Sequence, residues 1–243
     1  MAHGTPDWWG TGPKATTYAL QDLAELAVRL GSVNTYDRRG DVMWWDDWSS
    51  GLGRVEVTGT GVGYEVYLEA VGGRYQTAVV CLKTGNAAND LAGLNVAMHY
   101  PVLGGIGAEV SFVPHASMKD VRISVTLYVG DFTHWFYAAY KHTTGQVQIM
   151  DDTGAWVTIG TPGQQREGEH NYSTLKVVIN AITDKYARVL FNNKVYSVSG
   201  VGPSLVIDPS AQLMRTWVLT YTNEAAATIV KLGHLIVTQN EPL

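Results

Sequence analysis

Short runs in which hydrophobic and polar residues alternate follow one another along most of this chain. In Ser173–Asn180, for example, Leu175 and Val177 fall on one face of an extended segment, which is the pattern of a strand. Turn-forming residues interrupt the runs at intervals of roughly 8 to 12 residues, a spacing typical of sandwiches and barrels. In the first two thirds of the chain, we expect strands at Val42–Trp48, Arg54–Thr58, Tyr64–Val71, Tyr75–Lys83, Leu94–Tyr100, Gly107–Val113, Val121–Val129, Thr133–Lys141, Gln146–Met150 and Ala155–Ile159.

The last third of the chain predicts a hairpin and a final strand. The hairpin joins Tyr186–Phe191 to Lys194–Ser199 across Asn192 and Asn193, because asparagine tolerates the positive φ of a tight turn. A long loop is expected to follow the hairpin. The terminal strand is expected to end just before Pro242, since proline cannot donate to a ladder of backbone hydrogen bonds.

Residues 1–40 have a different pattern, which predicts an extended arm and one short α-helix. Thr17–Leu30 carries an apolar stripe at helical spacing, and Gly31 is suited to end the helix. The stripe either packs on the chain's own β domain or contacts another subunit, and the same two interpretations apply to the paired tryptophans of the arm, a residue type favoured as an interface anchor. The candidate interface residues are Trp8, Trp9, Leu20, Leu23, Leu26 and Leu30.

The remaining residues, 41–243, resemble the concanavalin A-like and laminin-G-like jelly-roll sandwiches. The resemblance lies in the order of strand, asparagine turn, strand, long loop and a last strand that ends at Val237–Pro242. The segment Trp44–Leu52 is also similar to the first strand and turn of lectin-like sandwiches. The resemblance implies an all-β, antiparallel jelly-roll sandwich whose last strand returns to pair near the first.

The composition agrees with a folded β domain and argues against nucleic acid and a membrane span. The chain has 243 residues, of which 46% are hydrophobic and 16% charged, with 26 Gly, 13 Tyr and 8 Trp. Its net charge of −5 and the lack of a basic stripe argue against nucleic acid. No apolar run approaches the roughly 18 residues of a membrane span, and we expect no signal peptide. Cys81 has no partner for a disulfide and is expected to be buried.

Glycosidases occur among the relatives of this fold, and they carry Glu-x-Asp-x-Glu on one strand so that two carboxylates share a face. The nearest match here is Glu65–Glu69, in which Tyr67 takes the place of the central aspartate. We therefore expect no catalytic residues and no enzymatic activity.

Metal-binding patterns are equally incomplete. Asp131 and His134 supply two groups of a lectin-type calcium and manganese cluster, without the asparagine and second carboxylate that complete it. The pairs Asp46-Asp47 and Asp151-Asp152 are interpreted as solvated turn carboxylates, with a single calcium ion as the alternative. The seven histidines show no zinc spacing. We expect no cofactor and no metal site.

Aromatic residues give the remaining candidate site. Trp135 and Tyr137 should lie on one face of their strand and Phe136 on the other. In sugar-binding sandwiches, exposed Trp and Tyr stack against pyranose rings, so Trp135 and Tyr137 are candidate glycan-stacking residues. The alternative is that one face belongs to the core and the other to an ordinary surface or interface.

The function expected first is that of a non-enzymatic virion structural protein of a tailed phage, either a capsid decoration or a tail-associated subunit. The run Leu23–Asp47 resembles the openings of phage structural proteins. The resemblance implies a homo-oligomer in contact with other virion proteins and, as a further partner, host carbohydrate. The chain would be made in the host cytoplasm and located in the virion. The alternatives are a carbohydrate-binding lectin-like module and, less favoured, a glycoside hydrolase.

Overall fold

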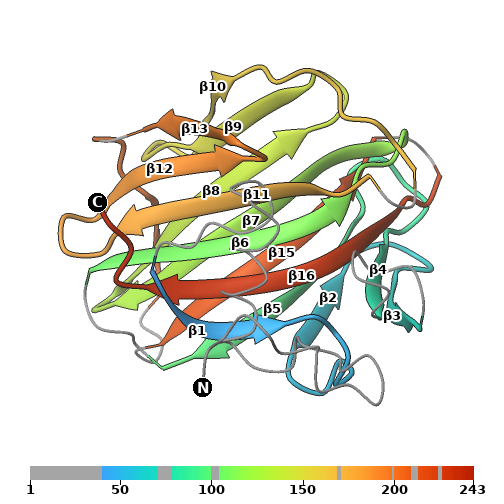
Figure 1. The fold of residues 1–243 in the computed structure, drawn as a ribbon, viewed down its shortest axis with the longest axis horizontal. Helices are drawn as coiled ribbons and strands as arrows, with labels where there is room; N and C mark the ends of the chain where they lie inside the picture. The colour runs from blue at the N-terminus through green and yellow to red at the C-terminus, as the bar shows by residue number, and fades with distance from the viewer. Residues whose placement is uncertain are drawn as a thin grey trace, which may run out of the picture. The chain divides into compact units, whose positions relative to one another are not determined.

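The computed structural model describes residues 40–70, 78–99, 104–168, 171–198, 200–208, 213–223 and 226–243. These residues form an all-β sandwich of two antiparallel sheets, and no helix occurs among them (Figure 1). The part of the chain that is described therefore contains no helix able to cross a membrane. The predicted arm, helix and interface residues, from Trp8 to Leu30, lie outside the described residues.

The first sheet has eight strands. They are β1 (Asp41–Asp46), β3 (Glu65–Glu69), β4 (Val79–Lys83), β6 (Gly105–Val113), β11 (Ser173–Asn180), β12 (Lys185–Phe191), β13 (Lys194–Ser197) and β16 (Ile229–Gln239). Their order is β13-β12-β11-β6-β16-β4-β3, and β1 also pairs with β16. The last strand thus returns to pair with the first, as the resemblance to jelly-roll sandwiches implied.

The second sheet also has eight strands. They are β2 (Glu56–Gly59), β5 (Leu91–Met98), β7 (Met118–Val129), β8 (Phe132–Lys141), β9 (Gln146–Met150), β10 (Trp156–Gly160), β14 (Ser204–Ile207) and β15 (Met214–Thr222). Their order is β10-β9-β8-β7-β15-β5-β2, and β14 pairs with the first half of β8. This arrangement is the lectin-like jelly roll that was expected.

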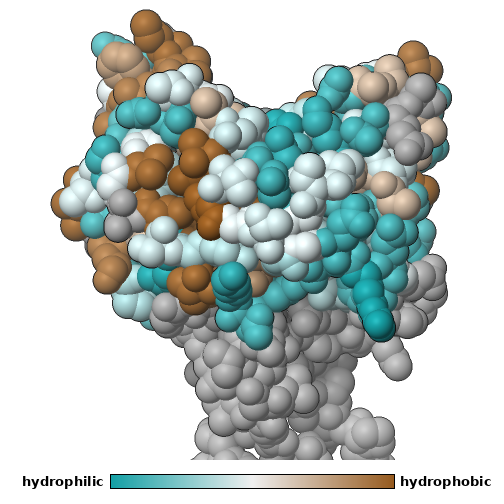
Figure 2. Space-filling model, turned by 90° about the horizontal axis from the view of Figure 1, so that it is seen from above, coloured by the Kyte–Doolittle hydropathy of each residue, from teal (hydrophilic) through white to brown (hydrophobic). Residues whose placement is uncertain are grey.

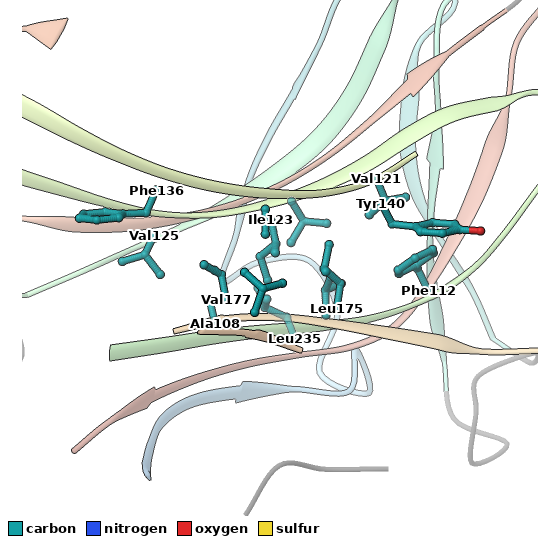
Figure 3. Packing of buried hydrophobic residues seen from close by; sticks show 14 of the residues in the cluster. Ala108, Phe112, Val121, Ile123, Val125, Phe136, Tyr140, Leu175, Val177 and Leu235 are labelled. Atoms are coloured by element: carbon teal, nitrogen blue, oxygen red, sulfur yellow. The ribbon is translucent and has the colours of Figure 1, made fainter. Parts of the chain in front are cut away.

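Alternation along the strands builds one core between the two sheets. Figure 3 shows side chains of the two sheets pointing toward one another across it. The first sheet contributes Ala108, Phe112, Leu175, Val177 and Leu235, and the second contributes Val121, Ile123, Val125, Phe136 and Tyr140. Tyr186 of β12 packs edge-on against Phe136 at 5.1 Å between ring centroids. It thereby ties the sheets together over their inner faces.

The prediction of a long loop after the hairpin is wrong. The hairpin itself is present, with Asn192 at a φ of 52° between β12 and β13. The segment beyond it, however, contains β14 and then β15, which lies in the middle of the second sheet between β7 and β5. The sequence of β15 shows no clear alternation of apolar and polar residues, because three of its five core-facing residues are buried threonines. They are Thr216, Thr220 and Thr222.

Cys81 of β4 is fully buried, as its apolar neighbours predicted. Burial raises the pKa of its thiol to about 12, and the Glu69 carboxylate nearby adds to the shift. Only the thiolate reacts with alkylating and disulfide reagents. The buried thiol should therefore be inert in the folded protein.

We expect the folded chain to react with a thiol reagent at pH 8 about a thousandfold more slowly than the unfolded chain. This factor follows from the thiolate fractions at a pKa of about 12 and at the ordinary thiol pKa of 9.0. Absorbance-monitored labelling, with the same protein unfolded in guanidinium as the control, measures both rates. Equal rates in the two states would contradict the burial of Cys81.

Candidate functional site

The outer face of the second sheet is hollowed. In Figure 3 the ribbons of this sheet bow toward the core at their middle and rise away from it at their ends. Figure 2 looks along the sandwich, and its upper margin, on the side that is at the back in Figure 1, is a hollow between two raised ends. Alternate residues of each strand of the sheet point into this concave face.

The strand register arranges the residues of the concave face in rows that cross the sheet. One row contains Trp135, Thr126, Arg215 and Ala97, from β8, β7, β15 and β5 in that order. The next contains Tyr137, Ser124, Trp217 and Asn95, from the same four strands. Directly opposite residues on neighbouring strands have side chains close enough to interact. In the two rows, large side chains from β8 and β15 lie on either side of the small residues Thr126 and Ser124, which are fully buried.

Four aromatic rings form a continuous platform on this face. Trp135 and Tyr137 are stacked, with ring centroids 5.3 Å apart and planes 8° from parallel. Trp217 lies 6.4 Å from Trp135 on one side, and Trp156 lies 6.3 Å from Tyr137 on the other. All four side chains are half-buried. The platform therefore draws on strands β8, β10 and β15.

Arg122 on β7 holds one end of the platform in place. Its guanidinium donates two hydrogen bonds of 3.0 Å to the Asp120 carboxylate, a bidentate geometry that is strong and directional. The guanidinium carbon also lies 3.7 Å from the ring centroid of Tyr221 and 5.0 Å from that of Trp156. The positive charge of Arg122 is thus neutralised by Asp120 and covered by aromatic rings.

Burial raises the pKa of both tyrosine hydroxyls near this arginine. The pKa of Tyr137 rises mainly through loss of contact with water, and the Tyr221 hydroxyl raises it further. The pKa of Tyr221 rises for the same main reason, against the lowering effect of Arg122. Both hydroxyls are therefore protonated at neutral pH and can donate hydrogen bonds.

Several buried polar atoms of the concave face have no hydrogen-bond partner among the residues that the structure describes. Two are acceptors, the side-chain oxygens Asn95 Oδ1 and Gln148 Oε1, on residues that are 2% and 6% exposed. Three are donors, Trp135 Nε1, Trp217 Nε1 and Arg215 Nε. A buried polar atom without a partner costs about 1–3 kcal/mol. The concave face is thus prepared for a ligand that offers both hydrogen-bond donors and acceptors.

The two glutamates that come nearest to a glycosidase motif in the sequence form ion pairs in the structure. Glu65 and Glu69 share a face of β3, and they form salt bridges with Lys83 at 3.0 Å and Lys231 at 2.8 Å. These partners fit a structural role for both glutamates.

Asp131 and His134, which the sequence offered as an incomplete metal-binding pattern, do not lie in one cluster. His134 Nδ1 lies 2.8 Å from the Asp184 carboxylate, in the turn between β11 and β12, whereas Asp131 lies in the exposed turn before β8. Asp151 accepts the backbone N–H groups of Thr153 and Ala155. No group of three or more metal-ligating side chains occurs among the described residues.

Asp46 departs from the expectation of a solvated turn carboxylate. It is buried at the end of β1, where its Oδ1 accepts the N–H of Trp48 at 2.7 Å. Burial is the largest cause that raises the pKa of this carboxyl, and Arg54, 4.0 Å from Oδ2, partly offsets the shift. The interpretation failed because Trp48 folds into the core and takes the turn with it.

The sequence located two members of the platform and missed the others. Alternation predicts Trp135 and Tyr137 on one face and Phe136 on the other. The structure has this arrangement, and the face of Phe136 is the one that meets the core. Trp217 is not identified from the sequence, because a loop is predicted where β15 lies. The signal is present, since the large residues of Arg215-Thr-Trp-Val-Leu-Thr-Tyr221 stand at every second position. Trp156 lies on an expected strand, but no sequence pattern indicated its proximity to Tyr137.

Comparisons with known proteins establish the fold. The chain matches no protein-family model and no curated protein. Among solved structures it is similar to a sialidase, with a TM-score of 0.52 and 11% identity over 83% of this chain and 19% of that one. It therefore spans about a fifth of the sialidase.

Two further structures resemble most of the chain. A protein of unknown function from Shewanella oneidensis MR-1 gives a TM-score of 0.50 and 11% identity, over 96% of this chain and 99% of that one. The potassium-bound carbohydrate recognition domain of Emp46p gives 0.49 and 11%, over 82% and 94%. At 11% identity, the similarity to the sialidase and to the Shewanella protein shows a shared fold alone.

Proposed function

We propose that this chain is a carbohydrate-binding module that holds a glycan on the concave face of its second sheet. The observation that carries the proposal is the platform of Trp135, Tyr137, Trp156 and Trp217, together with the unpaired buried polar atoms beside it. The lectin-like fold supports the proposal at the level of architecture. The proposed function is the carbohydrate-binding module that the sequence analysis gave as an alternative.

The chemistry of the concave face suits a sugar better than a purely apolar ligand. A pyranose ring has an apolar face that can cover an aromatic ring, and its rim carries hydroxyl groups. Each hydroxyl can both donate and accept, so one sugar can supply a partner for Asn95 Oδ1 or Gln148 Oε1 and for the indole N–H groups. Concave sites with many aromatic groups and a few fixed polar groups are typical of small-ligand binding.

The proposal assigns binding to this face and no hydrolysis. Glycoside hydrolysis uses two carboxylates that flank the scissile bond. On the described strands of this face, Asp120 is held by Arg122, and Glu56 lies exposed on the edge strand β2. This arrangement supports a non-enzymatic function. The location in a phage virion and the homo-oligomer remain predictions from the sequence.

A glycan array probed with the full chain tests the proposal. We expect binding to at least one class of glycan, and titration with that glycan should change the tryptophan fluorescence, because three indoles of the platform would lose contact with water. The control is titration with a glycan of the same array to which the chain does not bind. If no glycan is retained, or if the fluorescence does not respond to a retained one, the proposed face is wrong.

A further inference from the structure

Two arginines lie on the concave face, and only one of them forms an ion pair with a carboxylate of the described residues. Arg122 forms an ion pair with Asp120, whose side chain is 1% exposed. Arg215 lies two rows away on β15, and no ion pair joins it to any carboxylate of the described residues. The concave face therefore has one neutralised guanidinium and one guanidinium whose charge is not balanced.

The neighbours of Arg215 are neutral. In its own row it lies between Thr126 of β7 and Ala97 of β5. The guanidinium carbon is 5.9 Å from the ring centroid of Tyr128 and 6.0 Å from that of Trp217. The arginine is half-buried, and its buried Nε has no hydrogen-bond partner in the described part of the chain. Removing a charge from water without a counter-charge is costly, which points to an anion that completes the site.

Overall charge does not account for this feature, because the chain carries a net charge of −5 and would repel anions in general. The attraction is local to the platform. Trp135 and Arg215 are separated by one strand, so at the usual strand spacing they lie roughly 10 Å apart. Trp217 is closer to Arg215 still. A sugar ring over Trp217 or Trp135 would bring its substituents next to the guanidinium.

We infer that the ligand of the concave face is an acidic glycan, whose carboxylate or sulfate group is bound by Arg215. The inference rests on the proposed function and adds the class of sugar. Both groups present oxygen pairs that match the fork of a guanidinium. The aromatic rings would hold the sugar ring, and Arg215 would select the charged unit.

Three matched pairs of glycans test the inference by titration calorimetry on the full chain. They are sialyllactose with lactose, oligogalacturonide with its methyl ester, and a chondroitin sulfate oligosaccharide with its desulfated form. We expect the charged member of at least one pair to bind at least tenfold more tightly than its partner, as for hydrogen bonds to a charged group. The first two pairs test a carboxylate, and the third tests a sulfate. Affinity for the charged member should also fall as salt is added.

The variant Arg215→Gln should remove this preference, whereas Arg54→Gln should keep it. Arg54 is a matched control, because its guanidinium also covers a tryptophan at 4.0 Å, but that tryptophan is Trp44, on β1 of the first sheet. If Arg215→Gln fails to fold, Arg215→Lys keeps the charge without the fork, and it should retain the salt dependence with weaker binding.

The outcomes separate the inference from the function on which it rests. Equal binding of charged and neutral members, or array hits confined to neutral glycans, would overturn the inference and leave the carbohydrate-binding function standing. A charge preference that survives in Arg215→Gln would also overturn it. No binding to any glycan would remove both.

Discussion

Replacing Trp217 by alanine is expected to weaken glycan binding by about thirtyfold or more. The figure corresponds to the roughly 2 kcal/mol that marks a dominant binding residue, and such residues are typically tryptophans near the centre of a site. Trp217 lies on β15, in the middle of the sheet, with Trp135 at 6.4 Å and Arg215 at 6.0 Å from its ring. Its loss removes one ring and one unpaired N–H donor from the platform.

Titration calorimetry with the best array ligand measures this loss, and thermal unfolding checks that the variant remains folded. Phe132→Ala is the matched control. Phe132 begins β8, the strand of Trp135 and Tyr137. It is 43% exposed, and by alternation its side chain points to the opposite side of the sheet from theirs. The control should bind like the parent chain. If the two variants lose affinity to the same extent, the platform is not the binding surface.

Replacing Glu241 by alanine is expected to reduce the free energy of unfolding by about 3–5 kcal/mol, the cost of breaking a buried ion pair by removing one partner. The Glu241 carboxylate is fully buried, and it accepts Lys176 Nζ at 2.6 Å and Arg188 Nη2 at 2.5 Å. The hydroxyl of Thr238 donates to it as well, at 2.6 Å. Alanine would leave two cations of β11 and β12 without this counter-charge.

Urea unfolding followed by tryptophan fluorescence gives the free energies. The control is Glu65→Ala, which breaks the surface salt bridge to Lys83 at 3.0 Å. Glu65 is 59% exposed in that pair, so its loss should cost less than about 1 kcal/mol. A small effect of Glu241→Ala, no larger than that of Glu65→Ala, would show that Glu241 does not hold Lys176 and Arg188.

The sequence predicted the fold class because period-two alternation is unambiguous where one face meets the core. The expected bounds of Gln146–Met150 and Ser173–Asn180 agree with β9 and β11. The strand expected to begin at Leu94 begins earlier, at Leu91, because Ala92 and Gly93 are small and weaken the pattern. In β15 the pattern is reversed, since Trp217 and Tyr221 face outward while threonines face the core.

Less of the candidate site than of the fold could be predicted from the sequence, because the site depends on which strands are neighbours in the sheet. Trp135 and Tyr137 belong to one strand, so alternation alone put them on one face. The proximity of Trp217 to Trp135 requires the order β8-β7-β15, which joins residues about eighty positions apart in the chain. Likewise, the sequence alone could not show that the strand order gives Arg215 the uncharged neighbours Thr126 and Ala97.

The position of β16 has a consequence for how the chain acquires its structure during synthesis. This strand pairs with β1, β4 and β6, all of which leave the ribosome long before it (Figure 1). The first sheet therefore stays divided into separate groups of strands until β16 has been made. Pairings between such distant segments slow folding and leave strand edges exposed in the meantime. Until β16 is made, the nascent chain carries an unfinished first sheet whose groups of strands are not yet joined.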